Sequence, residues 1–79
     1  GSYASLKKGL EEQNGEEAFR AAHTLKGVCQ NLGFDNLYEV SFDITEKLRG
    51  RDTDGCEELF AKVTEQYEKT TDAIRMMED

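Results

Sequence analysis

Apolar residues recur every three or four positions along most of this chain, which is the spacing of one face of an α-helix. No segment shows the alternation of apolar and polar residues that a half-buried strand requires. Three breaks that contain glycine interrupt the helical spacing, at residues 14–15, 33–35 and 50–55. Because short connections place consecutive amphipathic helices antiparallel, the sequence predicts an all-α fold, an antiparallel up-down bundle of four helices.

The breaks place the predicted helices at residues 3–13, 15–32, 35 or 36 to 49, and 53 or 54 to 77, so the first helix is short. Asn14 is suited to cap the second helix, and Glu17 three residues later completes a capping-box pattern. Gly33 stands where a left-handed residue ends a helix, and Asp35 is the expected cap of the third helix. The expected seam of the fourth helix is close to a heptad and comprises Cys56, Leu59 or Phe60, Val63, Tyr67, Thr70, Ile74 and Met77.

Length and charge limit what the chain can do. With 79 residues it forms one small domain, which we place at residues 3–79, with Gly1 and Ser2 as a remnant of tag cleavage. The net charge of -7 argues against binding to nucleic acid or to an anionic membrane, since both require a basic surface. Without a long apolar run or a signal peptide pattern, a cytoplasmic protein is expected.

The two cysteines do not indicate a metal site. Cys29 and Cys56 are far apart in sequence, and a single histidine cannot complete a zinc ligand set with them. Both thiols suit a reducing compartment, and Cys29 falls on an apolar helix face where it acts as a small hydrophobic residue. We therefore expect no cofactor in this chain.

His23 is the only histidine in the chain, and it lies in the middle of the second predicted helix. On a helical wheel, Ala18, Ala22, Leu25 and Cys29 share one broad apolar arc, and His23 lies opposite that arc. The imidazole is therefore expected on the solvent side of a helix that is well anchored through its other face.

Lys26 and Gly27 follow the histidine by one helical turn. Glycine inside a helix costs ~1 kcal/mol relative to alanine, so Gly27 needs a reason. Four residues after His23, it removes the side chain that would crowd the imidazole on its own face. Lys26 can place an ammonium group near an anion carried by the ring. Free space and a balancing cation are what a phosphoaccepting histidine requires.

The segment His23-Thr24-Leu25-Lys26-Gly27, followed by Asn31-Leu32-Gly33, resembles the signature of histidine-phosphotransfer (HPt) domains. The resemblance implies a phosphorelay intermediate, in which His23 accepts a phosphoryl group from the aspartyl phosphate of a receiver domain and passes it to another. The implied partner is the receiver domain of a response regulator or of a hybrid histidine kinase. That partner is expected to supply the metal ion, and the chain itself is expected to have no ATP-dependent kinase activity.

The resemblance also implies supporting residues around the imidazole. The helix after the histidine often presents a glutamine to the ring in this family, and the shorter Thr45 occupies the matching position. Gln30, two turns after His23, is the nearer candidate for orienting the ring, and Ser41 is expected to let the two helices approach. Exposed aromatic residues beside a reactive polar group suit a transient interface. The expected partner-binding residues are Phe19, Arg20 and Phe34.

The sequence leaves two alternative functions open. The chain could be a helical docking module that binds and regulates a receiver or a sensor kinase without transferring a phosphoryl group. A dimerisation helix pair of a sensor kinase also carries an exposed histidine. That class has an acidic residue or asparagine where Thr24 stands and a proline shortly after, and this chain contains no proline.

The first predicted helix is the only one before the His23 helix, whereas HPt domains usually carry an additional N-terminal helix. We therefore expect an apolar surface that is incompletely covered. Such a surface could support self-association between two copies of the chain.

Overall fold

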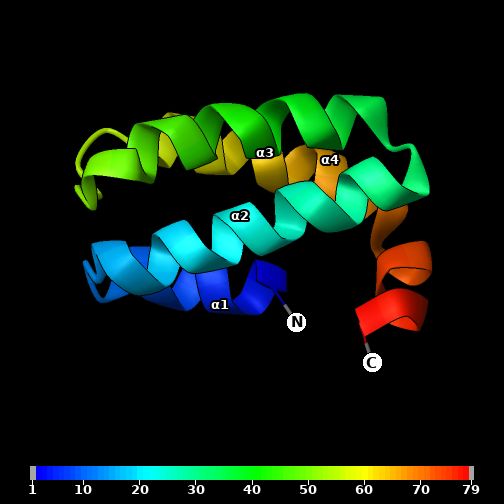
Figure 1. Cartoon of the computed structure of the whole chain (residues 1–79), viewed down its shortest axis with the longest axis horizontal. Helices are drawn as coiled ribbons and strands as arrows, with labels where there is room; N and C mark the ends of the chain where they lie inside the picture. Colours follow the sequence, from blue (N-terminus) through cyan, green and yellow to red (C-terminus); the bar gives the residue numbers. More distant parts are fainter. Residues whose placement is uncertain (1, 79) are drawn as a thin grey trace.

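The computed structural model describes the backbone of residues 2–78 and the side chains of residues 2–70. Its α-helices are α1 (Ser2–Glu11), α2 (Gly15–Leu32), α3 (Asp35–Lys47) and α4 (Glu57–Glu78), and a short 3-10 turn, η1 (Leu48–Gly50), follows α3. Consecutive helices run antiparallel, with α2 between α1 and α3 and with α4 behind them (Figure 1). The predicted all-α bundle is confirmed. None of the described helices is both long and apolar enough to cross a membrane.

The boundaries of α2 agree with the sequence prediction. The side-chain oxygen of Asn14 accepts a hydrogen bond from the Glu17 backbone N–H at 3.2 Å, and the Asn14 amide donates to the Glu17 carboxylate at 3.5 Å. At the other end, Gly33 adopts the left-handed conformation (φ 73°), and the Phe34 N–H donates to the Cys29 carbonyl at 3.0 Å. This closed C-terminal turn ends α2 and starts the connection to α3.

The predicted cap of α3 is wrong by one residue. Phe34, rather than Asp35, is the N-cap, and its carbonyl accepts the first helical hydrogen bond from the Tyr38 N–H at 2.8 Å. Because Phe34 also closes the end of α2, only Gly33 and Phe34 lie between the two helices. Asp35 thus lies in the first turn of α3, where a carboxylate is favoured by the positive end of the helix dipole. The far end of α3 tightens into η1 at Leu48, so the regular helix stops before the predicted Arg49.

Helix α4 begins at Glu57, later than the predicted Thr53 or Asp54. The Asp54 N–H donates to the Asp52 carboxylate at 2.9 Å, and Gly55 has a φ of 78°, so this stretch forms a turn. The seam positions with described side chains are buried or half-buried, with Cys56 and Val63 the most enclosed. Ile74 and Met77 lie outside the described side chains.

The hydrophobic core contains residues from all four helices, and α2 contributes the largest share of it. Cys29 and Cys56 are both buried, and they do not form a disulfide. Burial raises the pKa of the Cys56 thiol above its usual value, so this thiol stays protonated at neutral pH. The fully enclosed larger side chains are Leu6, Leu25, Leu37, Ile44, Leu48 and Val63.

Helix α1 is held by close contact on one side and by aromatic stacking on the other. A Cβ atom at Gly9 would lie 2.7 Å from the backbone nitrogen of Ala18, so glycine allows α1 to approach α2 this closely. The Tyr3 ring stacks on Tyr67 with 4.1 Å between centroids, and the Tyr3 hydroxyl lies 2.8 Å from that of Thr64. An open cavity of about 340 Å³ lies between the second half of α1 and the start of α4. Its lining includes Leu10, Cys56 and Phe60.

The self-association between two copies that the sequence predicts stays a prediction.

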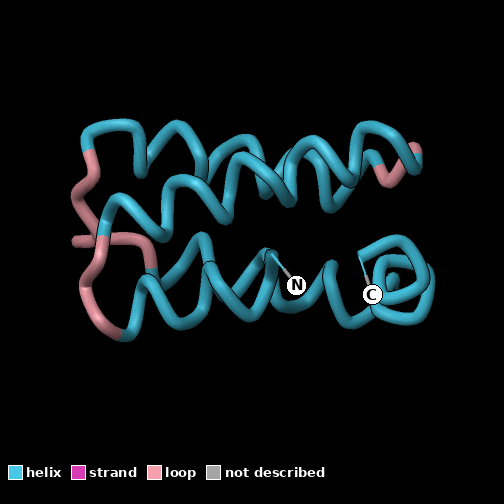
Figure 2. The backbone as a smooth tube through the Cα atoms, turned by 60° about the horizontal axis from the view of Figure 1, so that its bottom comes forward, coloured by secondary structure: helices cyan, strands magenta, loops and turns pink. Residues whose placement is uncertain are grey.

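The loop between α3 and α4 lies against the start of α2. Both the α1–α2 turn and this loop are at the same end of the bundle (Figure 2). A Cβ atom at Gly15 would overlap the backbone carbonyl of Arg51, so only glycine permits this contact. Arg51 itself adopts the left-handed conformation with a φ of 62°. This close approach brings a residue from a distant loop onto the helix that carries the histidine.

Ser41 offers a test of the packing between α2 and α3. It is fully buried, and its hydroxyl has no hydrogen-bond partner within the described part of the chain. Ser41→Ala keeps the small volume, removes an unsatisfied polar group and improves helix propensity. We expect the free energy of unfolding, measured by urea denaturation, to rise by about 1 kcal/mol. A loss of stability would mean that the hydroxyl forms a hydrogen bond in solution.

Candidate functional site

The buried face of α2 determines where its polar face points. Ala18, Ala22, Leu25 and Cys29 are all fully buried, which fixes the rotation of the helix about its axis. His23 lies on the opposite side and is exposed. The imidazole of His23 is therefore presented to solvent, as the sequence predicts.

The surface one turn beyond His23 is open. A Cβ atom at Gly27 would meet no atom within 4 Å, so nothing in the described chain requires glycine at this position. This contrasts with Gly9 and Gly15, where a Cβ atom would meet the backbone of a neighbouring element. Gly27 therefore leaves clearance next to the imidazole at a cost in helix stability that internal packing does not explain.

The Lys26 side chain extends from α2 across to α3. Its ammonium nitrogen lies 5.4 Å from the centroid of the Phe42 ring, within the range of a cation–π interaction. Residues three apart on a helix have their Cβ atoms roughly 5–6 Å apart, so the flexible stem of Lys26 can also reach a group carried by His23. In the structure the ammonium group therefore lies over a side chain of α3, and the lysine itself is one helical turn from His23.

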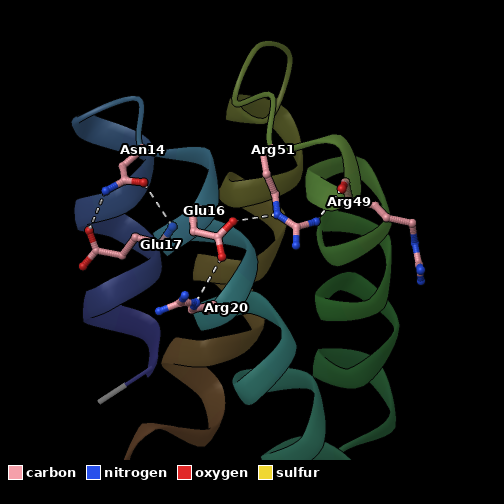
Figure 3. Close-up of polar contacts among 6 residues, drawn as sticks. All are labelled: Asn14, Glu16, Glu17, Arg20, Arg49 and Arg51. Atoms are coloured by element: carbon pink, nitrogen blue, oxygen red, sulfur yellow. Dashed lines mark hydrogen bonds and ion pairs between the residues drawn. The ribbon is translucent and has the colours of Figure 1, made fainter.

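The other side of His23 is flanked by Phe19 and a cluster of charges. The centroids of the Phe19 and His23 rings are 6.3 Å apart, and the Arg51 guanidinium lies 4.0 Å above the centroid of Phe19. The Glu16 carboxylate accepts a hydrogen bond from Arg51 at 3.0 Å and forms an ion pair with Arg20 at 3.2 Å (Figure 3). These contacts hold the Phe19 ring between the loop and the histidine.

The same charges set the ionisation of Glu16. The hydrogen bond and positive charge of Arg51, helped by Arg20, hold the pKa of the Glu16 carboxyl below its ordinary value. The carboxylate therefore stays ionised at neutral pH and balances the two cations. Because Arg51 is contributed by the distant loop, this ion pair joins the loop to α2 beside the face that carries His23.

The proposed supporting residues fall into different environments. Gln30 is exposed on the polar face of α2, where it is free to meet a partner. Thr45 is buried, and its hydroxyl donates to the Ser41 carbonyl at 2.6 Å, so that hydrogen is not directed at His23. Phe34 is half-buried against the core and caps α3, and Arg20 is exposed. The structure therefore gathers Phe19, His23, Lys26 and Gly27 at one surface and places Thr45 inside the bundle.

Two residues near this surface are absent from the sequence predictions. Arg51 lies in a loop, and no local pattern shows which helix that loop contacts. Phe42 lies next to Ser41 on α3 and therefore off the buried stripe formed by Leu37, Ser41 and Ile44. A large aromatic residue on the polar side of an amphipathic helix is a signal that could have identified Phe42.

Among the residues with described side chains, no group of three or more histidine, cysteine, aspartate or glutamate residues is placed to hold a metal ion. A neutral imidazole is a nucleophile, and an adjacent ammonium group can balance the charge of an incoming phosphoryl group.

Comparison with known protein families assigns the chain to a class. The family model described as Hpt domain matches residues 3–76, which is nearly the whole sequence. Comparisons with curated proteins and with solved structures gave no significant match. The chain belongs to the Hpt domain family. Histidine phosphotransfer in two-component phosphorelay signalling, and interaction with receiver domains of response regulators, are the activities of that family.

Proposed function

We propose that this Hpt domain is a phosphorelay intermediate in which His23 accepts a phosphoryl group from the aspartyl phosphate of one receiver domain and passes it to another. The observation that carries this proposal is the exposed imidazole, with open space at Gly27, on a helix within an Hpt domain. The same position also agrees with the His-x-x-Lys-Gly signature in the sequence.

In the proposed reaction, the lone pair of the His23 Nε2 attacks the phosphorus atom. The new P–N bond forms as the bond between phosphorus and the aspartyl oxygen breaks, and the carboxylate of the receiver leaves. Transfer to a second receiver reverses these steps at another aspartate. Phosphoryl transfer depends mainly on alignment and charge neutralisation, and Lys26 supplies the charge from this chain.

The remaining chemistry is proposed to belong to the partner. We infer that this chain needs no cofactor of its own and that the receiver contributes the metal ion. The sequence contains no glycine-rich segment with the spacing of a phosphate-binding loop, and we expect no ATP-dependent kinase activity. The expected cellular location of this exchange is the cytoplasm.

The proposal is tested with a receiver domain phosphorylated on its aspartate with radiolabelled phosphate. We expect the label to move to this chain, to be acid-labile and base-stable, and to leave again when a second, unphosphorylated receiver is added. A chain that binds the phosphorylated receiver without gaining label would instead be the docking module.

Lys26→Ala separates charge stabilisation from docking. Because the ammonium group balances charge during transfer, we expect the transfer rate at a saturating concentration of receiver to fall about tenfold. This is less than the 100-fold or more seen for enclosed donors, since Lys26 is half-exposed. Rapid-quench kinetics measure the rate, and Lys62→Ala on α4 is the matched control. Weaker receiver binding with an unchanged transfer rate would contradict this role.

A further inference from the structure

Phe42 is the one exposed large hydrophobic side chain in the part of the chain whose side chains are described, with 41% of its surface accessible. Helix α3 does not need this residue for its core, because Leu37, Ile44 and Ser41 form the buried face. A single exposed aromatic residue is common on protein surfaces and by itself indicates nothing. What distinguishes Phe42 is its contact with Lys26, the lysine one helical turn from His23.

Phe42 lies next to the surface formed by Phe19, His23, Lys26 and Gly27. The Lys26 ammonium lies 5.4 Å from the Phe42 centroid, and Lys26 is one helical turn from His23. On the other side, the Tyr38 ring lies 6.3 Å from the ring of Phe42. An aromatic strip therefore extends from α3 to the lysine beside the histidine.

The distance to His23 is within the reach of a transient interface. A small interface buries about 1,000 Å² in total, and half of that area corresponds to a disc with a radius of about 13 Å. One helical turn, the length of a lysine side chain and the 5.4 Å from its ammonium to the Phe42 centroid give a path of about 17 Å, which is an upper limit on the separation of the two rings. An interface of standard size covers about 800 Å² on each partner, a disc with a radius of about 16 Å. A receiver domain centred on His23 would therefore cover the ring of Phe42 as well.

The charges near Phe42 indicate what kind of surface fits it. Glu39 and Asp43 are exposed and, with Tyr38 and Phe42, line a shallow hollow of about 240 Å³. The chain as a whole carries a net charge of -7. A complementary surface has an apolar centre with basic groups at its rim.

We propose that Phe42 is a contact residue for the receiver domain and a determinant of receiver affinity. It contacts an apolar patch with a basic rim next to the phosphorylated aspartate of the receiver. This inference rests on the proposed function, because it takes the receiver as the occupant of the surface. It extends the site from α2 to α3, where none of the sequence-predicted partner contacts, Phe19, Arg20 and Phe34, is a residue of α3.

The test compares Phe42→Ala and Phe42→Leu with the wild-type chain in transfer from the phosphorylated receiver that labels the wild type fastest in a panel. For Phe42→Ala we expect the receiver concentration at half-maximal rate to rise at least fivefold, with the maximal rate within twofold of wild type. Phe42→Leu keeps much of the apolar area and should retain most of the affinity. Glu58→Ala on α4 is an exposed control, and circular dichroism checks that each variant is folded.

Failure of this inference can be told apart from failure of the proposed function. If the wild type is labelled and Phe42→Ala is labelled with the same concentration dependence, Phe42 is not a contact residue and the phosphorelay function stands. If Phe42→Ala and Phe42→Leu instead lower only the maximal rate, the ring acts by positioning Lys26 and the contact proposal is wrong. If no receiver labels the wild type, both proposals fall together.

Discussion

Replacing His23 with glutamine is expected to abolish labelling by a phosphorylated receiver. Glutamine has a similar size and remains polar, but its amide nitrogen has no available lone pair with which to attack phosphorus. His23 is exposed, and the core of α2 is formed by the opposite face, so the fold should be unaffected. The measurement is radiolabel transfer, followed over a time in which the wild type is fully labelled.

Stability and binding provide the controls for His23→Gln. An exposed substitution away from the core is expected to change the free energy of unfolding by no more than about 0.5 kcal/mol. Receiver binding should persist, because most of the contact surface is unchanged. If the folded His23→Gln variant is labelled at the wild-type rate, another residue is the acceptor and the assignment of His23 is incorrect.

Substitution of Gly27 is expected to separate stability from transfer. A Cβ atom at this position meets nothing within 4 Å, so Gly27→Ala should increase the free energy of unfolding by about 1 kcal/mol through helix propensity alone. Gly27→Leu also favours the helix, but its side chain would occupy the clearance next to His23. Because misplacement of reacting groups by 1 Å can cost about 100-fold in rate, we expect a loss of that order for Gly27→Leu.

The two Gly27 variants serve as controls for each other. Gly27→Ala adds a single methyl group and should slow transfer less than Gly27→Leu, although both variants are expected to be at least as stable as the wild type. Thermal denaturation and rapid-quench transfer kinetics measure the two effects. Wild-type transfer by a stable Gly27→Leu variant would show that the glycine does not provide clearance for the partner.

The helices and the exposure of His23 follow from local rules. Asn14 and Gly33 set the limits of α2 through hydrogen bonds and backbone conformation within a few residues, and these signals are visible in the sequence. The position of His23 opposite the apolar arc follows from helical periodicity alone. The N-cap of α3 was misplaced by one residue because Phe34 serves both helices, and the sequence does not show that a residue closes one helix while it opens the next.

The residues beside the histidine depend on contacts between distant segments. Arg51 reaches Phe19 only because its loop lies on Gly15, and Phe42 reaches Lys26 only because α3 packs along α2. Helical periodicity predicts which face of a helix is buried. It does not predict which residues on the polar faces of two neighbouring helices contact each other. Thr45 illustrates the same limit, since its hydroxyl bonds within its own helix.

The proposed phosphoacceptor is a single imidazole nitrogen, and NMR can identify it. The chain is labelled with ¹⁵N, phosphorylated by a receiver domain, and analysed for coupling between phosphorus and nitrogen. We predict a single phosphorus bonded to an imidazole nitrogen of His23, and its signal should disappear when a second receiver is added. Phosphorus on any other residue, or an unmodified imidazole in a chain that binds the phosphorylated receiver, would contradict it.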